Sequence, residues 1–378
     1  MFACFVRRSR DRREHNCCVM LSISSTIVLS MAIGPTGVAR SWETRGVYQN
    51  RPSMPPLEDI GEKVGVRPPW KAPRWAWSNA WRVGRAALPV LHKWDDCAPT
   101  DTNVNLWVCW LKAISGNSRT GYPDNGLAYD LLPPVTRRIV ARPFASFYPL
   151  LHHQNVALRS AFLDQRVEAE CQRAAADLAD AEGEAQQTAV VVLGAGFDLR
   201  SLRLSSEAAR ACRWVEVDLP HVVEQRRRLL ARLTRRRPEL VARSEGLGSL
   251  AANLSMAEEV TATLRSALQP TKRASTSSSI TRDGGTAIFV FEALLIYIEP
   301  EAAAGLLRAC ADEAAAAGFA RATLCFADRL PGVKGFEYDE ARSMLAQTGF
   351  ALEEETWLPK PGLARHMGVA RSGDHIGL

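Results

Sequence analysis

The sequence has little that would point to a metal site, a disulfide scaffold or a nucleic-acid partner. Its nine Cys are odd in number and form no Cys-x-x-Cys pair, which disfavours disulfide-stapled and zinc-thiolate proteins. The seven His show no ligand-type spacing, so we expect no metal. The net charge is +6, but residues 1–40 hold six Arg and two carboxylates, which leaves only +2 for the remaining 338 residues. A body this close to neutral predicts no nucleic-acid partner.

The first forty residues have the composition of a targeting leader. A basic stretch over residues 7–13 precedes an uncharged run over residues 17–33, and small residues follow. This order fits a secretory or organelle presequence better than a membrane-spanning helix, so we expect no span in the mature chain. Without a leader the protein would be cytoplasmic. The alternative is an over-extended gene model whose true start is Met20 or Met31.

A second zone, residues 41–125, is rich in Trp and Pro. It holds eight of the ten Trp of the chain. We interpret this zone as a helical cap over the main domain, because Trp is usually a packing residue. The alternative interpretation is an interaction surface.

Strands and helices alternate in the rest of the chain, residues 126–378. Unbroken apolar runs at 189–193 and 287–291 are typical of strands buried on both faces. The other expected strands are 214–217, 322–326 and 350–357, and the expected helices are 156–185, 219–233, 299–317 and 338–348. This alternation predicts an α/β domain with a mostly parallel sheet and helices on both faces. The Ser/Thr-rich residues 269–285 are expected to form a flexible loop.

A glycine turn follows the first of these strands. Residues 190–200 read VVVLGAGFDLR, so an apolar strand runs into Gly194 and Gly196 and then into a helix. Glycine allows the tight turn and the close approach of a ligand to the main chain, and the helix start offers N–H groups. A nicotinamide dinucleotide fold would have a third Gly where Leu199 stands, which disfavours an oxidoreductase.

Two carboxylates stand at the ends of expected strands. Asp218 comes 24 residues after Gly194, where an acidic side chain can accept hydrogen bonds from both ribose hydroxyls of a nucleoside cofactor. Glu292 directly follows a buried strand, at the sheet edge where open α/β sheets bind ligands. Because an unpaired buried charge is costly, we expect Glu292 to have a cationic or hydrogen-bonding partner.

Together these segments resemble the leucine carboxyl methyltransferase family, a branch of the class I S-adenosylmethionine-dependent methyltransferases. The matching pieces are LGAGFDLRSLRL (193–204), VEVDLP (215–220), ANL (252–254) and FEALLIYIEPE (291–301). The resemblance covers about residues 125–370 and implies a Rossmann-like fold with S-adenosyl-L-methionine as the cofactor. It assigns Gly194 and Gly196 to the cofactor loop, and it places Asp218 at the ribose and Glu292 near the cofactor.

Three further residues take cofactor-binding roles from the resemblance. Arg159 matches the arginine that pairs with the carboxylate of the cofactor, although Arg166 is a rival because the interval to Gly194 is long. Asn253 and Leu254 stand where the family usually has Asp-Leu beside the adenine. An Asn carbonyl can still accept a hydrogen bond from the adenine amino group.

The implied reaction is methyl transfer by in-line displacement, in which the protein mainly orients two reactants. We expect a small-molecule acceptor with a carboxylate or a hydroxyl group, because the C-terminal part of the chain is short. The alternatives are a C-terminal leucine carboxylate of a phosphatase subunit and a non-catalytic interaction module. A carboxylate acceptor needs no general base, whereas a hydroxyl would be helped by one. The candidate bases are Tyr297, Asp198, His152 and His153, and the sequence singles out none of them.

Overall fold

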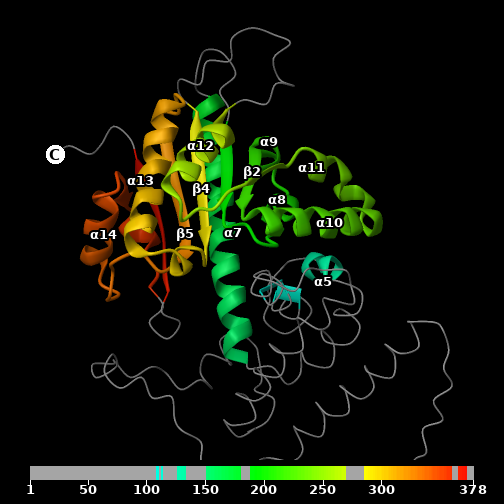
Figure 1. Ribbon diagram of the computed structural model, residues 1–378, viewed down its shortest axis with the longest axis horizontal. Helices are drawn as coiled ribbons and strands as arrows, with labels where there is room; N and C mark the ends of the chain where they lie inside the picture. The colour runs from blue at the N-terminus through cyan, green and yellow to red at the C-terminus, as the bar shows by residue number, and fades with distance from the viewer. Residues whose placement is uncertain are drawn as a thin grey trace, which may run out of the picture.

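The computed structural model describes residues 108–109, 112–113, 126–132, 150–179, 188–269, 285–359 and 365–372. These stretches form a seven-stranded sheet with helices packed on both faces (Figure 1). The expected leader, nearly all of the Trp-rich zone and nearly all of the expected loop lie outside the described residues, so those expectations stay predictions. No helix within the described stretches combines the length and the apolar character needed to cross a bilayer.

The sheet has the strand order β3-β2-β1-β4-β5-β7-β6. Its strands are β1 Ala189–Leu193, β2 Arg213–Asp218, β3 Gly248–Ala251, β4 Thr286–Glu292, β5 Arg321–Asp328, β6 Ala351–Leu352 and β7 His366–Ser372. Strands β1 to β5 run parallel, and β7 runs antiparallel to both of its neighbours. The expected mostly parallel sheet is therefore confirmed.

The helices are α5 Leu127–Leu131, α7 Leu150–Ala179, α8 Arg200–Arg203, α9 Glu207–Ala211, α10 Pro220–Arg236, α11 Val241–Glu245, α12 Ala257–Leu268, α13 Pro300–Ala316 and α14 Tyr338–Ala346. Helices α5 and α7 precede β1, and the helices from α8 onward lie between successive strands. Short 3-10 turns span Pro238–Leu240, Leu295–Tyr297 and Glu354–Thr356. Both α10 and α13 carry Pro at their first turn, where the missing N–H leaves no intrahelical bond unmade.

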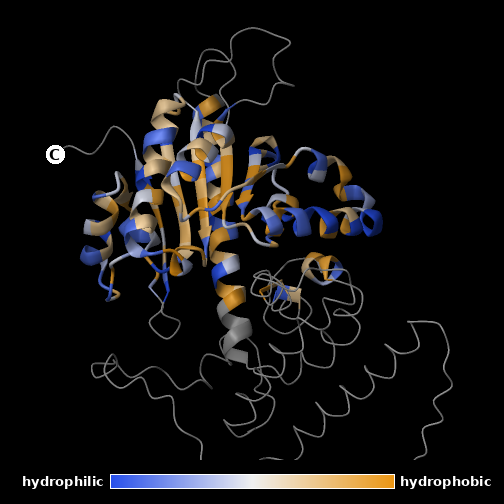
Figure 2. Cartoon of the chain, in the orientation of Figure 1, coloured by the Kyte–Doolittle hydropathy of each residue, from blue (hydrophilic) through white to orange (hydrophobic). Residues whose placement is uncertain are grey.

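Alternate residues of each central strand serve opposite layers of the core. Val191 and Leu193 pack with α12, α13 and α14, whereas Val190 and Val192 pack with α7 and α9. This arrangement explains why β1 is apolar at all five positions, since neither face meets water. Figure 2 shows the same contrast, with apolar strands inside and charged helix faces outside.

The expected strands were wrong or incomplete at three places in the sheet. Residues 350–357 do not form one strand, because Thr356 lies in a 3-10 turn and its Oγ1 accepts the N–H of Val369 at 2.8 Å. Strand β7 was missed because it carries polar ends and pairs with β5, far away in sequence. Strand β3 was missed because it is a half-exposed edge strand without an apolar run.

The strand order reverses between β1 and β4. The chain moves from β1 outward through β2 to β3 and then crosses to β4, on the other side of β1. Helices on either side of such a switch point diverge, which opens a crevice at the carboxyl ends of the strands. The turn after β1 and Glu292 at the end of β4 meet at this crevice.

Candidate cofactor-binding site

A pocket of about 420 Å³ lies at the switch point. Its walls come from the ends of β1 to β4, from α7, from the residue before β7 and from residues 108, 109 and 112. All seven residues that the sequence singled out line it: Arg159, Gly194, Gly196, Asp218, Asn253, Leu254 and Glu292. The volume falls within the roughly 300–1,000 Å³ of ligand pockets in proteins.

The glycine turn forms the floor of the pocket. Gly194 and Gly196 have φ values of 63° and 50°, a left-handed region that side chains with a Cβ rarely adopt. A Cβ on Gly194 would also lie only 2.7 Å from Cδ1 of Leu294, so the turn after β4 packs directly on this glycine. The N–H of Gly196 donates to Asp218 Oδ2 at 2.6 Å, which fixes the turn to the end of β2.

Asp218 lies between the glycine turn and the start of α10. Its Oδ1 accepts the N–H of Leu219 at 2.7 Å, and its Oδ2 accepts the N–H of Gly196. Burial raises the pKa of this carboxyl, and the two backbone bonds oppose that rise. Each carboxylate oxygen keeps a further acceptor position, so the side chain can take hydroxyl donors from a ligand.

Asn253 and Leu254 form the wall after β3. The Asn253 Oδ1 accepts the N–H of Ser255 at 3.1 Å, a local turn that fixes the orientation of the side chain. The Asn253 N–H donates to Glu259 Oε2 at 2.7 Å. Leu254 is buried in the core beneath the pocket. The amide oxygen of Asn253 retains a second lone pair for a ligand donor.

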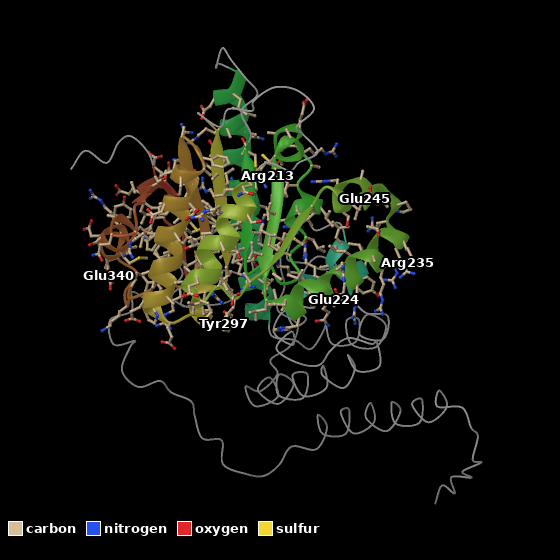
Figure 3. The ribbon with its side chains drawn as sticks, turned by 45° about the horizontal axis from the view of Figure 1, so that its top comes forward. Arg213, Glu224, Arg235, Glu245, Tyr297 and Glu340 are labelled. Carbon is tan, nitrogen blue, oxygen red and sulfur yellow. The ribbon has the colours of Figure 1, made fainter. Side chains whose placement is uncertain are left out.

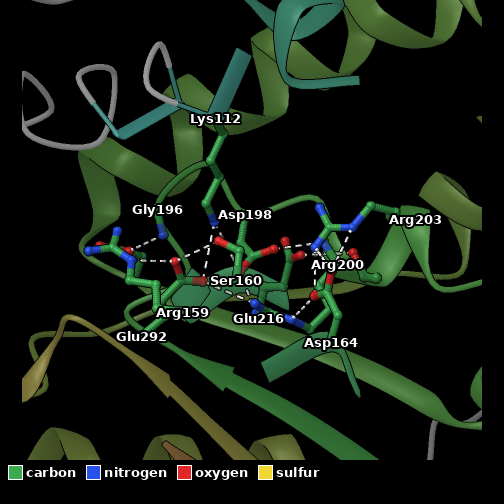
Figure 4. Close-up of polar contacts among 12 residues, drawn as sticks. Lys112, Arg159, Ser160, Asp164, Gly196, Asp198, Arg200, Arg203, Glu216 and Glu292 are labelled. Carbon is green, nitrogen blue, oxygen red and sulfur yellow. Dashed lines mark hydrogen bonds and ion pairs between the residues drawn. The ribbon is translucent and has the colours of Figure 1, made fainter. Parts of the chain in front are cut away.

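Glu292 is the centre of a buried set of ion pairs (Figure 4). Its Oε1 accepts from Arg159 Nε at 2.8 Å and from Ser160 Oγ at 3.2 Å. Its Oε2 accepts from Lys112 Nζ at 3.2 Å and from Arg200 Nη2 at 3.0 Å. The expected cationic partner is thereby confirmed. Burial alone would raise the pKa of Glu292, but these three cations hold it well below its usual value.

A second layer of charges supports the first. Arg200 donates to Asp198 Oδ2 at 2.5 Å and to Asp164 Oδ1 at 2.7 Å, and Asp164 also pairs with Arg203. We call the whole set the Glu292 cluster; its members are Lys112, Arg159, Asp164, Asp198, Arg200, Arg203 and Glu292. Four cations face three carboxylates, so the cluster keeps one positive charge beside the pocket. Such an excess favours an anionic ligand.

The turn that follows β4 is held by Asp328 at the end of β5. Ala293 has a φ of 57°, a strained value for a residue with a Cβ. Asp328 Oδ2 accepts the N–H groups of Leu294 and Leu295 at 2.5 and 2.8 Å. The turn brings Tyr297 to the rim of the pocket, where its side chain is 65% exposed at the outer edge of the domain (Figure 3).

The structure distinguishes between the two candidate arginines and among the candidate bases. Arg159 lines the pocket, whereas the rival Arg166 lies over the ring of Phe162 at 5.4 Å and is not among the lining residues. Asp198 is bound to Arg200; burial would raise its pKa, but Arg200 and Lys112 lower it, so it is a poor base. Tyr297 stays a candidate. The side chains of His152 and His153 lie outside the described part of the chain.

Sequence reasoning missed Lys112, Arg200 and Arg365 as residues of this site. Arg200 stands in the segment after the glycine turn, and its position there was the available signal. Lys112 belongs to the Trp-rich zone, 180 residues from its partner Glu292, and no local pattern marks it. Arg365 precedes the unexpected strand β7.

The fold and its pocket define the class of the protein. A sheet of order 3-2-1-4-5-7-6 with a reversed seventh strand and a ligand crevice at the β1/β4 switch point is the fold of class I S-adenosylmethionine-dependent methyltransferases. The model of the leucine carboxyl methyltransferase family matches residues 149–311, so the chain is similar to that family over this stretch. The predicted resemblance is confirmed. A search of curated proteins gave no significant match.

Similar solved structures share a low sequence identity with the chain. One is the magnesium protoporphyrin IX methyltransferase of Synechocystis PCC 6803 with bound S-adenosylmethionine, at 15% identity, 58% coverage of this chain, 83% of that chain and a TM-score of 0.32. Another is an O-methyltransferase of Nostoc punctiforme PCC 73102, described there as putative, at 11% identity, 58% and 59% coverage and a TM-score of 0.32. A third is an O-methyltransferase from neocarzinostatin biosynthesis, at 16% identity, 59% and 60% coverage and a TM-score of 0.29.

Proposed function

We propose that the protein transfers a methyl group from S-adenosyl-L-methionine to an oxygen atom of a small-molecule acceptor that carries a carboxylate or a hydroxyl. One observation carries the proposal. The residues that the family resemblance assigns to the cofactor come from five separate segments, and all of them line one pocket at the switch point. This convergence in one pocket supports a shared ligand.

The chemistry of the lining fits the cofactor. Asp218 offers carboxylate oxygens to ribose hydroxyls, and Asn253 and Leu254 offer an amide oxygen and an apolar surface to a purine. Arg159 and the positive excess of the Glu292 cluster suit the carboxylate of the methionine part. The glycine turn lets the main chain approach the ligand without a Cβ in the way.

The chain contributes position and exclusion of water. When bound, the cofactor supplies the electrophilic methyl group. Asp218 and Arg159 hold two ends of one ligand, which makes the encounter with the acceptor effectively intramolecular. Apolar side chains of Leu254, Leu294 and Ile298 line the pocket and keep out water, which would compete with the acceptor. For a hydroxyl acceptor, the Tyr297 hydroxyl at the pocket rim is the described candidate that could accept the acceptor's hydrogen bond and pass the proton on to bulk water.

The direct test is calorimetry of the full chain with S-adenosylmethionine, S-adenosylhomocysteine and NADH. We expect the first two to bind and NADH not to bind. Asp218→Ala should weaken S-adenosylhomocysteine binding about 10- to 100-fold without unfolding the chain, as loss of a charged hydrogen-bond acceptor predicts. Asp312→Ala, an exposed carboxylate on α13, is the matched control and should bind normally. The proposal is contradicted if the wild-type chain is folded but binds neither methionine derivative.

Transfer of label separates the alternatives. The protein is incubated with methyl-labelled cofactor and a cell extract, and the label is followed into protein and into small metabolites. We expect it in small molecules. A base-labile label on protein would favour carboxyl methylation of a phosphatase subunit instead. Cofactor binding with no transfer to any fraction would favour the non-catalytic module.

A further inference from the structure

Arg365 lines the pocket and immediately precedes β7. Five of the seven proposed cofactor residues follow β1, β2 and β3, whereas Arg159 on α7 and Glu292 at the end of β4 lie close enough to Arg365 to act on its charge. Tyr297 and Ile298, which also line the pocket, follow β4. In the sheet order β3-β2-β1-β4-β5-β7, Arg365 and the proposed ribose and adenine residues occupy opposite halves. The half that holds Arg365 is therefore the half left for a second ligand.

The guanidinium of Arg365 is buried near one carboxylate but keeps a nitrogen free to donate a hydrogen bond. Its side chain is only 13% exposed, and its Nη1 lies 3.7 Å from Asp328 Oδ1, beyond hydrogen-bond distance. This nitrogen has no hydrogen-bond partner in the described structure. Asp328 does not depend on the guanidinium, because the backbone N–H groups of the turn after β4 and of Arg329 already donate to its carboxylate.

The other two cations of the pocket are engaged. Lys112 and Arg159 each donate a hydrogen bond to Glu292. Among the lining residues that the structure describes, Arg365 is the cation with no hydrogen-bonded carboxylate. Burial lowers the pKa of Arg365, and the nearby Arg159 lowers it further. An anionic ligand in the pocket beside Arg365 would offset both effects on the charge.

We propose that Arg365 determines acceptor specificity by binding a carboxylate of the methyl acceptor, which makes that acceptor a small organic acid. A planar guanidinium suits this role because it can donate two parallel hydrogen bonds to one carboxylate. Leu294, Ile298 and Tyr297 line the same pocket, so the acid should carry an apolar or aromatic body. The identification of the bound acid as the methyl acceptor rests on the proposed function. The family match ends at residue 311 and implies nothing about Arg365.

The test compares acids with their neutral amides on the full chain saturated with S-adenosylhomocysteine. The probes are benzoate with benzamide and indole-3-acetate with indole-3-acetamide, and binding is measured by calorimetry and ligand-observed NMR. We expect the wild type to prefer each acid at least about tenfold, as one charged hydrogen-bonded contact predicts. Arg365→Gln should abolish this preference, and Arg365→Lys should keep part of it, because the charge remains and the fork is lost. Arg308→Gln, an exposed arginine on α13, should behave as wild type.

A readout on the cofactor guards against a merely structural effect. Arg365→Gln should bind S-adenosylhomocysteine with unchanged affinity and melt as the wild type does, whereas Arg159→Gln should lose that affinity. The proposal is overturned if the wild type does not distinguish acid from amide, or if Arg365→Gln keeps the distinction. It is also overturned if Arg365→Gln weakens S-adenosylhomocysteine as much as Arg159→Gln does. If Arg365→Gln fails to fold, the Arg365→Lys comparison decides. If S-adenosylhomocysteine does not bind at all, the proposed function fails, and the acid–amide comparison without it still decides whether Arg365 binds carboxylates.

Discussion

The Glu292 cluster and Arg365 contribute to the same pocket but differ in how closely their charges are paired. In the cluster, Lys112, Arg159 and Arg200 meet Glu292 at 2.8 to 3.2 Å. Arg365 has one carboxylate neighbour, at 3.7 Å, and Nη1 makes no hydrogen bond. A buried charge is tolerated when it is paired, and pairing fixes its position. The cluster therefore shapes the site, whereas Arg365 keeps bonding capacity for a ligand.

The largest expected effect tests the structural side of this comparison. Glu292→Gln removes the negative charge that three cations share, so it should lower the free energy of unfolding by about 3–5 kcal/mol. Urea denaturation of the chain without cofactor measures this change. Glu301→Gln, an exposed residue of α13, is the matched control and should differ little from wild type. If Glu292→Gln proves no less stable than Arg365→Gln, the distinction between the two regions collapses.

An intermediate effect tests the glycine turn that the cluster adjoins. Gly194→Ala combines a φ of 63° with a Cβ 2.7 Å from Leu294 Cδ1, so it should destabilise the fold by about 1–3 kcal/mol and weaken cofactor binding. Gly305→Ala on α13 meets nothing within 4 Å and should stabilise the chain by about 0.4–1 kcal/mol. Thermal melts of both variants supply the comparison.

A double variant separates the two causes of the Gly194 effect. Gly194→Ala with Leu294→Ala removes the contacts with Leu294 Cδ1 and Cγ at 2.7 and 3.1 Å, but it leaves the contact with Cβ at 3.0 Å and the backbone strain. We expect the pair to couple favourably in a double-mutant cycle. Simple additivity of the two single changes would show that the contact with Leu294 does not matter.

The smallest expected effect is a pH dependence of the stability that the Glu292 cluster contributes. The pKa of Glu292 is held below its usual 4.5, so its stabilisation is fully present above pH 4.5 and is lost as the pH falls through the lower folded value. The stability difference between wild type and Glu292→Gln should therefore be constant from pH 7 to 5 and shrink in more acidic solution. Urea titrations at each pH measure it, with Glu301→Gln as the reference. A difference that grows on acidification would contradict the ion-pair assignment.

Local patterns in the sequence were enough for the centre of the fold. The run Ala189–Leu193 was predicted as a strand because burial on both faces demands apolar residues throughout, and the structure has the same bounds. The tight turn at the two glycines that follow was predicted because glycine tolerates backbone conformations and close packing that other residues rarely allow. The structure has both glycines in the left-handed region. Strand β7 escaped because its pairing with β5 is decided by residues some fifty positions away.

The sequence by itself determined the parallel core, the glycine turn and the carboxylates at the strand ends, since each depends on neighbours within a few positions. Only the tertiary structure decided which charges are paired. Lys112 reaches Glu292 across 180 residues, and Arg365 faces the same pocket from the start of an antiparallel strand. Ion pairing depends on distances between side chains after packing, and no periodicity encodes such distances. For this reason the residues proposed for the cofactor could be predicted, and the cation proposed for the acceptor could not.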